Sequence, residues 1–167
     1  MTTREHLIYH LQELYAFHRD FLPLLDSMRH ESGNERLRDL LHDMHEGLKS
    51  EMEILERALN LLGGQYKHER NAVVPGLKED TQRFKHQMNP SQEQLDIHSA
   101  LEALKVAHFA IGAYFGDMEL ARSLGEQDVV TLLQENLQRQ RNGEKSIQQY
   151  MPALVQGITR AETRHAA

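Results

Sequence analysis

Apolar residues recur at every third or fourth position over four long stretches of the chain, and this spacing predicts four long helices. The stretches cover about residues 3–31, 34–62, 91–124 and 126–156. A shorter pattern of the same kind predicts a fifth helix over about residues 77–88. The sequence therefore predicts an all-α fold.

The boundaries of these stretches carry residues that favour helix ends. Thr2 and Ser91 each precede a stretch and are followed three residues later by Glu or Gln, a pattern in which the two side chains cap each other's backbone. Gly63 and Gly125 directly follow two of the stretches, and glycine is common immediately after a helix. These residues support the predicted boundaries.

The lengths of the connections predict how the helices are arranged. Few residues join the first two long helices or the last two, whereas residues 63–90 separate the pairs. Short connections make antiparallel neighbours, and the long one suits a crossover along the bundle. We therefore expect a ferritin-like four-helix bundle with an additional short helix in the crossover. It forms one domain over residues 1–156, and the small, polar residues 157–167 are expected to form a flexible C-terminal tail.

Polar residues interrupt the apolar stripe near the middle of each long predicted helix. Long helices of similar length that pack side by side bring their midpoints to one level, so these residues are expected to form one polar layer. Burying such groups costs free energy unless they are paired. The interrupting residues are His18, Glu51 (with Gly47 one turn before it), His108, and Gln140 together with Glu144.

Two interpretations of this layer follow from the residues. In the first, His18, His108, Gln140 and Glu144 form a hydrogen-bonded network that fixes the register of the helices. In the second, His18, Glu51, His108 and Glu144 are candidate ligands of one Fe, Mn or Zn ion, because bundles build metal centres from imidazoles and carboxylates on facing helices. The spacing alone favours the network.

Several other residues carry weaker signals. The chain has eleven histidines. His6 and His10 are four residues apart, and His42 and His45 are three apart, on predicted helices. Such pairs can bind a divalent ion at a surface, and some pairs also arise by chance among so many histidines. Tyr114 is expected to place its hydroxyl near the polar layer, because a buried tyrosine needs a hydrogen-bond partner.

Segments of three predicted helices resemble one bacterial protein family. Residues 103–114, followed by 121–125, resemble the third helix of the YciE/YciF-type ferritin-like stress proteins. Residues 12–18 and 55–56 also fit, and the resemblance covers about residues 4–155. It implies a ferritin-like fold with a short crossover helix, an association with bacterial stress responses, and a homodimer. It also implies carboxylates and histidines at the positions of a di-iron centre.

Most of the positions at which the resemblance implies metal ligands carry other residues in this chain. His18 stands where the family typically has Glu, and Gly47 where an acidic residue is expected. His108 is retained, but the acids near it are replaced by alanines, whereas Glu144 keeps its acid. We therefore predict a degenerate di-iron site and a non-catalytic structural or interaction protein without a cofactor. The alternative is a metal-binding or redox protein with a mononuclear His/carboxylate site.

Composition limits the remaining classes of function. The chain has no cysteine, which excludes disulfides, thiolate metal sites and cysteine nucleophiles. Its formal net charge of −6 disfavours nucleic acid as a partner. No apolar run approaches the roughly 20 residues of a membrane span, and no apolar signal core follows the first residues. We expect a cytoplasmic protein that acts as a homodimer or through an unidentified protein partner.

Overall fold

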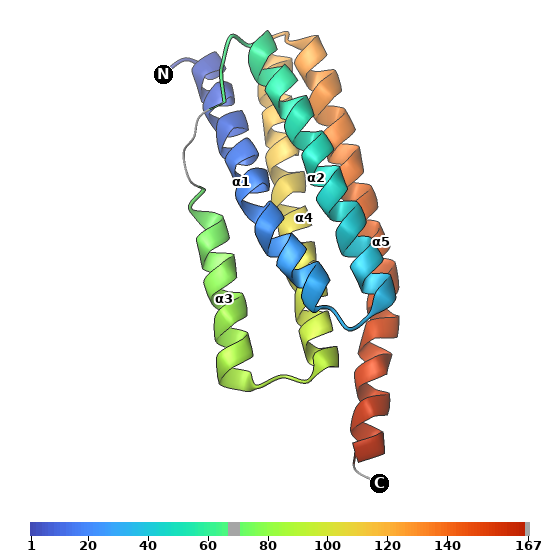
Figure 1. Cartoon of the computed structure of the whole chain (residues 1–167). Coiled ribbons are helices and arrows are strands. Elements are labelled where there is room, and N and C mark those ends of the chain that lie inside the picture. The colour runs from blue at the N-terminus through green and yellow to red at the C-terminus, as the bar shows by residue number, and fades with distance from the viewer. Residues whose placement is uncertain (67–70, 166–167) are drawn as a thin grey trace.

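The computed structural model describes residues 1–66 and 71–165, without the side chains of residues 159 and 161–165. It confirms the predicted fold class, an all-α ferritin-like bundle (Figure 1). The helices are α1 (Thr3–Glu31), α2 (Glu35–Leu61), α3 (Val73–Met88), α4 (Gln92–Ser123) and α5 (Gln127–His165). None of the described helices is long and apolar enough to cross a membrane.

The four long helices pack as two antiparallel hairpins. Short connections link α1 to α2 and α4 to α5, and the bundle closes through contacts of α2 with α5 and of α1 with α4. The long connection returns the chain to the other end of the bundle, so that α2 and α4 run in the same direction (Figure 1). The short α3 belongs to this crossover and lies outside the bundle against α1 and α4.

The helix ends follow the chemistry that the sequence predicts. Thr2 and Ser91 both form complete capping boxes, in which the hydroxyl accepts from a backbone N–H and the later side chain accepts from the backbone N–H of the capping residue. Gly63 and Gly125 follow α2 and α4 with φ of 75° and 72°. Glycine adopts this left-handed conformation without steric cost, so the chain can turn sharply at both places.

Two helices are longer than the sequence pattern predicts. The α3 helix begins at Val73 rather than near residue 77, because the Asn71 side chain accepts hydrogen bonds from the Val73 and Val74 N–H groups. Pro75 then lies in the first turn, where a helix tolerates proline. The α5 helix continues to His165, through residues that were expected to form the tail (Figure 1). Residues 157–165 contain no proline to stop a helix that is already formed.

The buried face of α4 differs from the predicted one. The spacing of the large apolar residues in this helix predicts a buried stripe that runs through Ile97, Leu101, Leu104, His108, Ile111, Phe115 and Met118. In the structure, however, the Leu101 and Phe115 side chains are 45% and 53% exposed. The face that packs into the bundle consists mainly of small residues, with Tyr114 among them. The small buried residues are Ala100, Ala103, Ala107, Ala110 and Ala121. Because α4 is apolar on both faces, the spacing of its large residues did not identify the buried one.

Candidate functional site

Five buried polar side chains meet in the middle of the bundle, and each of the four long helices contributes at least one. We call this group the polar layer. All five side chains belong to residues that are less than 5% exposed. Its members are His18 on α1, Glu51 on α2, Tyr114 on α4, and Asn136 and Gln140 on α5.

The Glu51 carboxylate is the central acceptor of the polar layer. Its Oε2 atom accepts a hydrogen bond of 2.8 Å from the Gln140 amide and one of 3.1 Å from the Tyr114 hydroxyl. The Nε2 atom of His18 lies 3.1 Å from the same oxygen. Hydrogen bonds to a carboxylate are stronger than those between neutral groups, so three protein groups stabilise this buried oxygen.

The Tyr114 hydroxyl links the remaining members of the layer. It lies 2.7 Å from His18 Nε2 and accepts a hydrogen bond of 3.1 Å from the Asn136 amide, which also donates to the Glu51 backbone carbonyl. Burial, and then the nearby Glu51 charge, raise the pKa of Tyr114 well above its usual value. The phenol therefore stays protonated and serves as a fixed donor.

Two atoms of the layer lack partners. The His18 Nδ1 and Asn136 Oδ1 atoms have no hydrogen-bond partner among the described residues. Both contacts of His18 are made by Nε2, so a neutral ring with its proton on Nε2 leaves Nδ1 as a bare acceptor. In this tautomer the Nε2–H group of His18 has partners, and Nδ1 is the atom of the ring that lacks one.

The structure divides the four candidate metal ligands into two separate pairs. His18 and Glu51 lie together in the polar layer. His108 and Glu144 form an ion pair of 3.1 Å on the surface, where the His108 side chain is 62% exposed. The structure does not place His108 and Glu144 in the buried layer, contrary to the prediction. Helix α4 is rotated relative to its predicted stripe and turns His108 outward with Leu101 and Phe115. The Glu144 side chain, on α5, pairs with His108 at the surface instead of with the layer and is 16% exposed.

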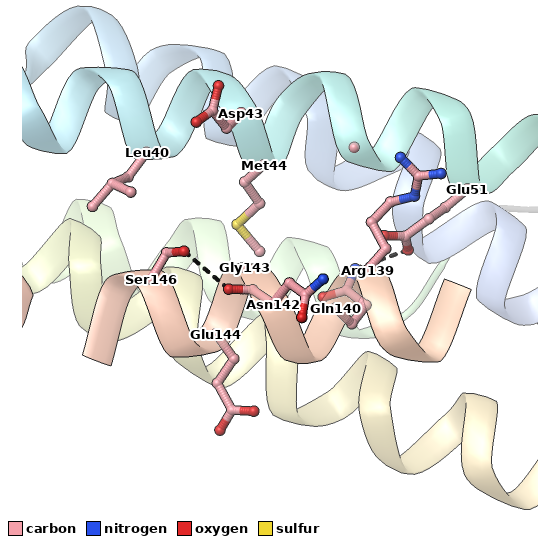
Figure 2. A pocket seen from close by; sticks show the side chains of 11 residues that line it. Leu40, Asp43, Met44, Glu51, Arg139, Gln140, Asn142, Gly143, Glu144 and Ser146 are labelled. Atoms are coloured by element: carbon pink, nitrogen blue, oxygen red, sulfur yellow. Dashed lines mark hydrogen bonds between the residues drawn. The ribbon is translucent and has the colours of Figure 1, made fainter. Parts of the chain in front are cut away.

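A pocket of about 230 Å³ lies between α2 and α5 beside the polar layer. Glu51 and Gln140 lie at one end of it, and Met44 projects into the space between the helices (Figure 2). The pocket exists partly because Gly47 and Gly143 have no side chains to fill it. Glu144 also lines it, but its carboxylate points away from α2 (Figure 2).

The donor set of the polar layer does not fit a di-iron centre. Such a centre needs several carboxylates that neutralise and bridge the two ions, whereas this layer supplies one carboxylate and one imidazole. Over the described parts of the chain, no group of three or more His, Asp or Glu side chains is arranged to hold a metal ion. What the layer does provide is a set of donors around one carboxylate oxygen.

The sequence pattern predicts three of the five members of the layer, suggests a fourth and does not single out Asn136. His18, Glu51 and Gln140 interrupt an apolar stripe, which is a readable signal. Tyr114 was expected near the layer because of its hydroxyl, and it proves to be one of its main links. The available signal for Asn136 is its place four residues before Gln140, which puts both amides on the same side of α5.

The fold and the site define an all-α protein of the ferritin-like four-helix class, with a polar layer across the middle of the bundle. The chain belongs to the family described as a domain of unknown function, DUF892, whose profile matches residues 2–159. The comparison with curated proteins finds no match.

Three of the solved structures with a similar fold are bacterial proteins. The stress protein YciF of E. coli has a TM-score of 0.86 and 20% identity, covering 93% of this chain and 98% of its own. YcfI of Rhodopseudomonas palustris has a TM-score of 0.82 and 21% identity, covering 89% and 94%. A protein of Xanthomonas campestris pv. campestris has a TM-score of 0.81 and 19% identity, covering 97% and 99%. These matches confirm the resemblance to YciE/YciF-type proteins.

Proposed function

We propose that this protein is a non-catalytic, stress-associated bundle protein with a degenerate di-iron site, which acts through its structure and its surface. The observation that carries this proposal is the set of protein groups that contact Glu51 Oε2. That one oxygen faces the Gln140 amide, the Tyr114 hydroxyl and His18 Nε2, all at 3.1 Å or less. Because protein donors surround the oxygen that a metal ion would need, the layer works as a hydrogen-bonded network.

The chemistry of the neighbouring side chains supports the same function. An amide nitrogen and a protonated phenol are poor metal ligands, and both point at Glu51. The network ties together all four long helices, so it fixes their register as a buried polar network can. The association with stress rests on the likeness to E. coli YciF, which is described as a stress protein, and on the resemblance of the sequence to that family.

A homodimer is the assembly that we propose for this bundle. The outer face of α4 carries large apolar side chains that the bundle does not cover, including Leu101 and Phe115 two heptads apart. At 1.5 Å per residue, the 32 residues of α4 extend over about 48 Å. Such a length is enough for the roughly 800 Å² per partner that a stable interface buries. A second copy of α4 offers the same apolar surface and would cover this one.

The dimer is tested by light scattering of the wild type and of the double variant Leu101→Glu/Phe115→Glu. The wild type is expected to have the mass of two chains and the variant that of one. Leu61→Glu is the matched control, because Leu61 is 52% exposed at the end of α2, and it should leave the dimer intact. A monomeric wild type would exclude this part of the proposal.

A mononuclear centre is the alternative function, and one observation favours it. His18 and Glu51 are adjacent in the core, and the pocket between α2 and α5 gives small ions a route to Glu51. A single Fe, Mn or Zn ion held there would have to displace the Tyr114 and Gln140 hydrogen bonds. No third ligand of the imidazole or carboxylate type stands beside this pair in the described residues.

One experiment separates the two functions. Untagged protein is reconstituted with Fe²⁺, Mn²⁺ or Zn²⁺, and its metal content and rate of iron oxidation are compared with those of Glu51→Gln. The network predicts that metal content is the same in both proteins and that neither oxidises iron faster than buffer. Metal that is present in the wild type and lost in Glu51→Gln would overturn the proposal and establish the mononuclear centre.

A further inference from the structure

A pair of histidines lies near the start of α1, well away from the polar layer. His6 and His10 are one turn apart, and their Nε2 atoms are 3.0 Å from each other. The two rings meet edge to face, with centroids 4.6 Å apart. His10 precedes His18 by eight residues, or about 12 Å along the helix axis. The pair is therefore a separate cluster at the rim of the bundle.

A buried carboxylate stands behind this pair. Asp117 lies on the inward side of α4, and its side chain is 3% exposed. Its Oδ1 atom lies 3.7 Å from the Nδ1 atom of His10. Its Oδ2 atom is buried and has no hydrogen-bond partner within the described residues. A buried carboxylate that lacks donors is costly, so a charge or donor brought to this place would stabilise the protein.

We propose that His6 and His10 bind one divalent transition-metal ion through their Nε2 atoms, and that Asp117 is the positioning residue behind His10. Two histidines four residues apart on a helix present both rings on one face, which is the spacing that helical zinc sites use. Zinc–imidazole bonds of about 2.0–2.1 Å require nitrogens a little over 3 Å apart, close to the observed separation. Imidazole is a ligand that suits zinc, copper and nickel.

The position of Asp117 follows the usual design of a metal-bound histidine. A ring that binds metal through Nε2 carries its proton on Nδ1, and this N–H commonly donates to a carboxylate that fixes the ring orientation. The Nδ1 atom of His10 faces Asp117. A small rotation of either side chain would bring the two groups within hydrogen-bond distance. The donated hydrogen bond would give the buried carboxylate a donor at Oδ1.

The electrostatic environment favours a cation at this place. Asp117 contributes a buried acidic group, and Glu13 lies one turn beyond His10 with its negative charge acting on that ring. With two protein ligands, water completes the coordination shell, so the site is open on its solvent side.

The test is a titration of untagged, chelator-treated protein with Zn²⁺, followed by calorimetry and by ¹⁵N spectra of the histidine rings. We expect one Zn²⁺ per chain, with the Nε2 signals of His6 and His10 shifting together. His6→Gln and His10→Gln should each abolish this binding. The matched control is His42→Gln/His45→Gln, which removes two histidines three residues apart on α2 and should leave the affinity within about twofold.

Asp117→Asn distinguishes a positioning role from a merely structural one. Loss of an outer carboxylate typically weakens metal affinity by about 10–100-fold. The same substitution removes a desolvated charge from the core, so the metal-free variant should have a higher melting temperature than the wild type. If Asp117 had only a structural role, Asp117→Asn would change the metal-free melting temperature and leave the zinc affinity unchanged. A positioning role predicts weaker zinc binding together with a higher metal-free melting temperature.

Three results would overturn the proposal. These are zinc binding that survives His10→Gln, binding that the control variant loses equally, and histidine signals that do not shift with zinc. Zinc bound in the core would depend on Glu51 instead, so Glu51→Gln tells the two sites apart. The proposed zinc site of His6 and His10 can therefore be tested separately from the network proposed for the polar layer.

Discussion

Glu51 and Asp117 are both buried carboxylates that face a histidine of α1, yet their surroundings are opposite. Glu51 lies 3.1 Å from His18 and also accepts from Tyr114 and Gln140. Asp117 lies 3.7 Å from His10, and one of its oxygens has no partner in the described part of the chain. Donors within the bundle satisfy the first carboxylate. The second lacks such donors, so a hydrogen-bond donor or a cation from outside the bundle would be needed to stabilise it.

This difference indicates which buried acid stabilises the fold and which one is retained at a cost. A paired buried group stabilises its partners and is expensive to remove, because they are then left unsatisfied. An unpaired buried group destabilises the native state by its own desolvation. Substitutions at the two acids should therefore change the free energy of unfolding in opposite directions.

The largest effect is expected for Glu51→Leu. It leaves the Gln140 amide, the Tyr114 hydroxyl and His18 Nε2 without their common acceptor, and breaking such a buried set costs about 3–5 kcal/mol. Urea denaturation measures this loss. Glu53→Leu, on an exposed site of the same helix, is the control and should lie within about 0.5 kcal/mol of the wild type. A cost below 1 kcal/mol for Glu51→Leu would show that the network does not stabilise the bundle.

The second-largest change in the free energy of unfolding is expected for Asp117→Asn. This change is stabilising, and its size depends on pH. Burial raises the pKa of Asp117 to about 7, compared with 3.8 for an unperturbed carboxyl. Between these two values the unfolded chain has lost a proton that the folded protein keeps, so stability falls as pH rises, by at most about 1.4 kcal/mol per pH unit. Asp117→Asn removes this dependence and should be more stable than the wild type at pH 7.

Chemical denaturation of both proteins between pH 4 and 8, with chelator present, measures this difference. Asp39→Asn changes an exposed carboxyl and serves as the control. If the wild type and Asp117→Asn had parallel stability profiles over this range, the carboxyl would not be desolvated in solution as it is in the structure.

A smaller loss is expected for Tyr114→Phe. The variant removes the hydroxyl that links His18, Glu51 and Asn136, but each of those three residues keeps another contact in the layer or with the backbone. Losing one buried hydroxyl with partial compensation should cost about 1–2 kcal/mol, as measured by urea denaturation. Tyr9→Phe, at a side chain that is 51% exposed, should be close to neutral. A loss as large as that of Glu51→Leu would place the centre of the network at the phenol.

The sequence predicted the bundle better than it predicted the site, and α4 shows why. Loop lengths, capping boxes and the glycines after α2 and α4 are local signals, and the structure agrees with each of them. The rotation of α4 is not local, because it depends on which face packs more closely against α1 and α5. Alanines pack the helix tightly but carry a weak hydrophobic signal, so the larger residues Leu101 and Phe115 indicated the wrong face.

That rotation also explains which site residues could be read from the sequence. His18, Glu51 and Gln140 lie on helices with a distinct apolar stripe, and all three were found. The large apolar residues of α4 predict that His108 belongs to the layer, because it shares a face with Leu101 and Phe115. The residue of α4 that reaches the layer is Tyr114. A polar residue in a stripe is informative only where the stripe itself is unambiguous.

The smallest effect should therefore come from His108→Gln, although the sequence pattern ranked this residue with His18. Its side chain is 62% exposed, and its ion pair with Glu144 is at the surface. Exposed ion pairs contribute about 0–1 kcal/mol, and salt screens them further, so the variant should stay within about 0.5 kcal/mol of the wild type. His18→Gln, in the core, is the comparison, because it disturbs contacts to both Tyr114 and Glu51. Equal losses for the two variants in urea denaturation would mean that His108 faces the core in solution and that α4 has the orientation its large apolar residues predict.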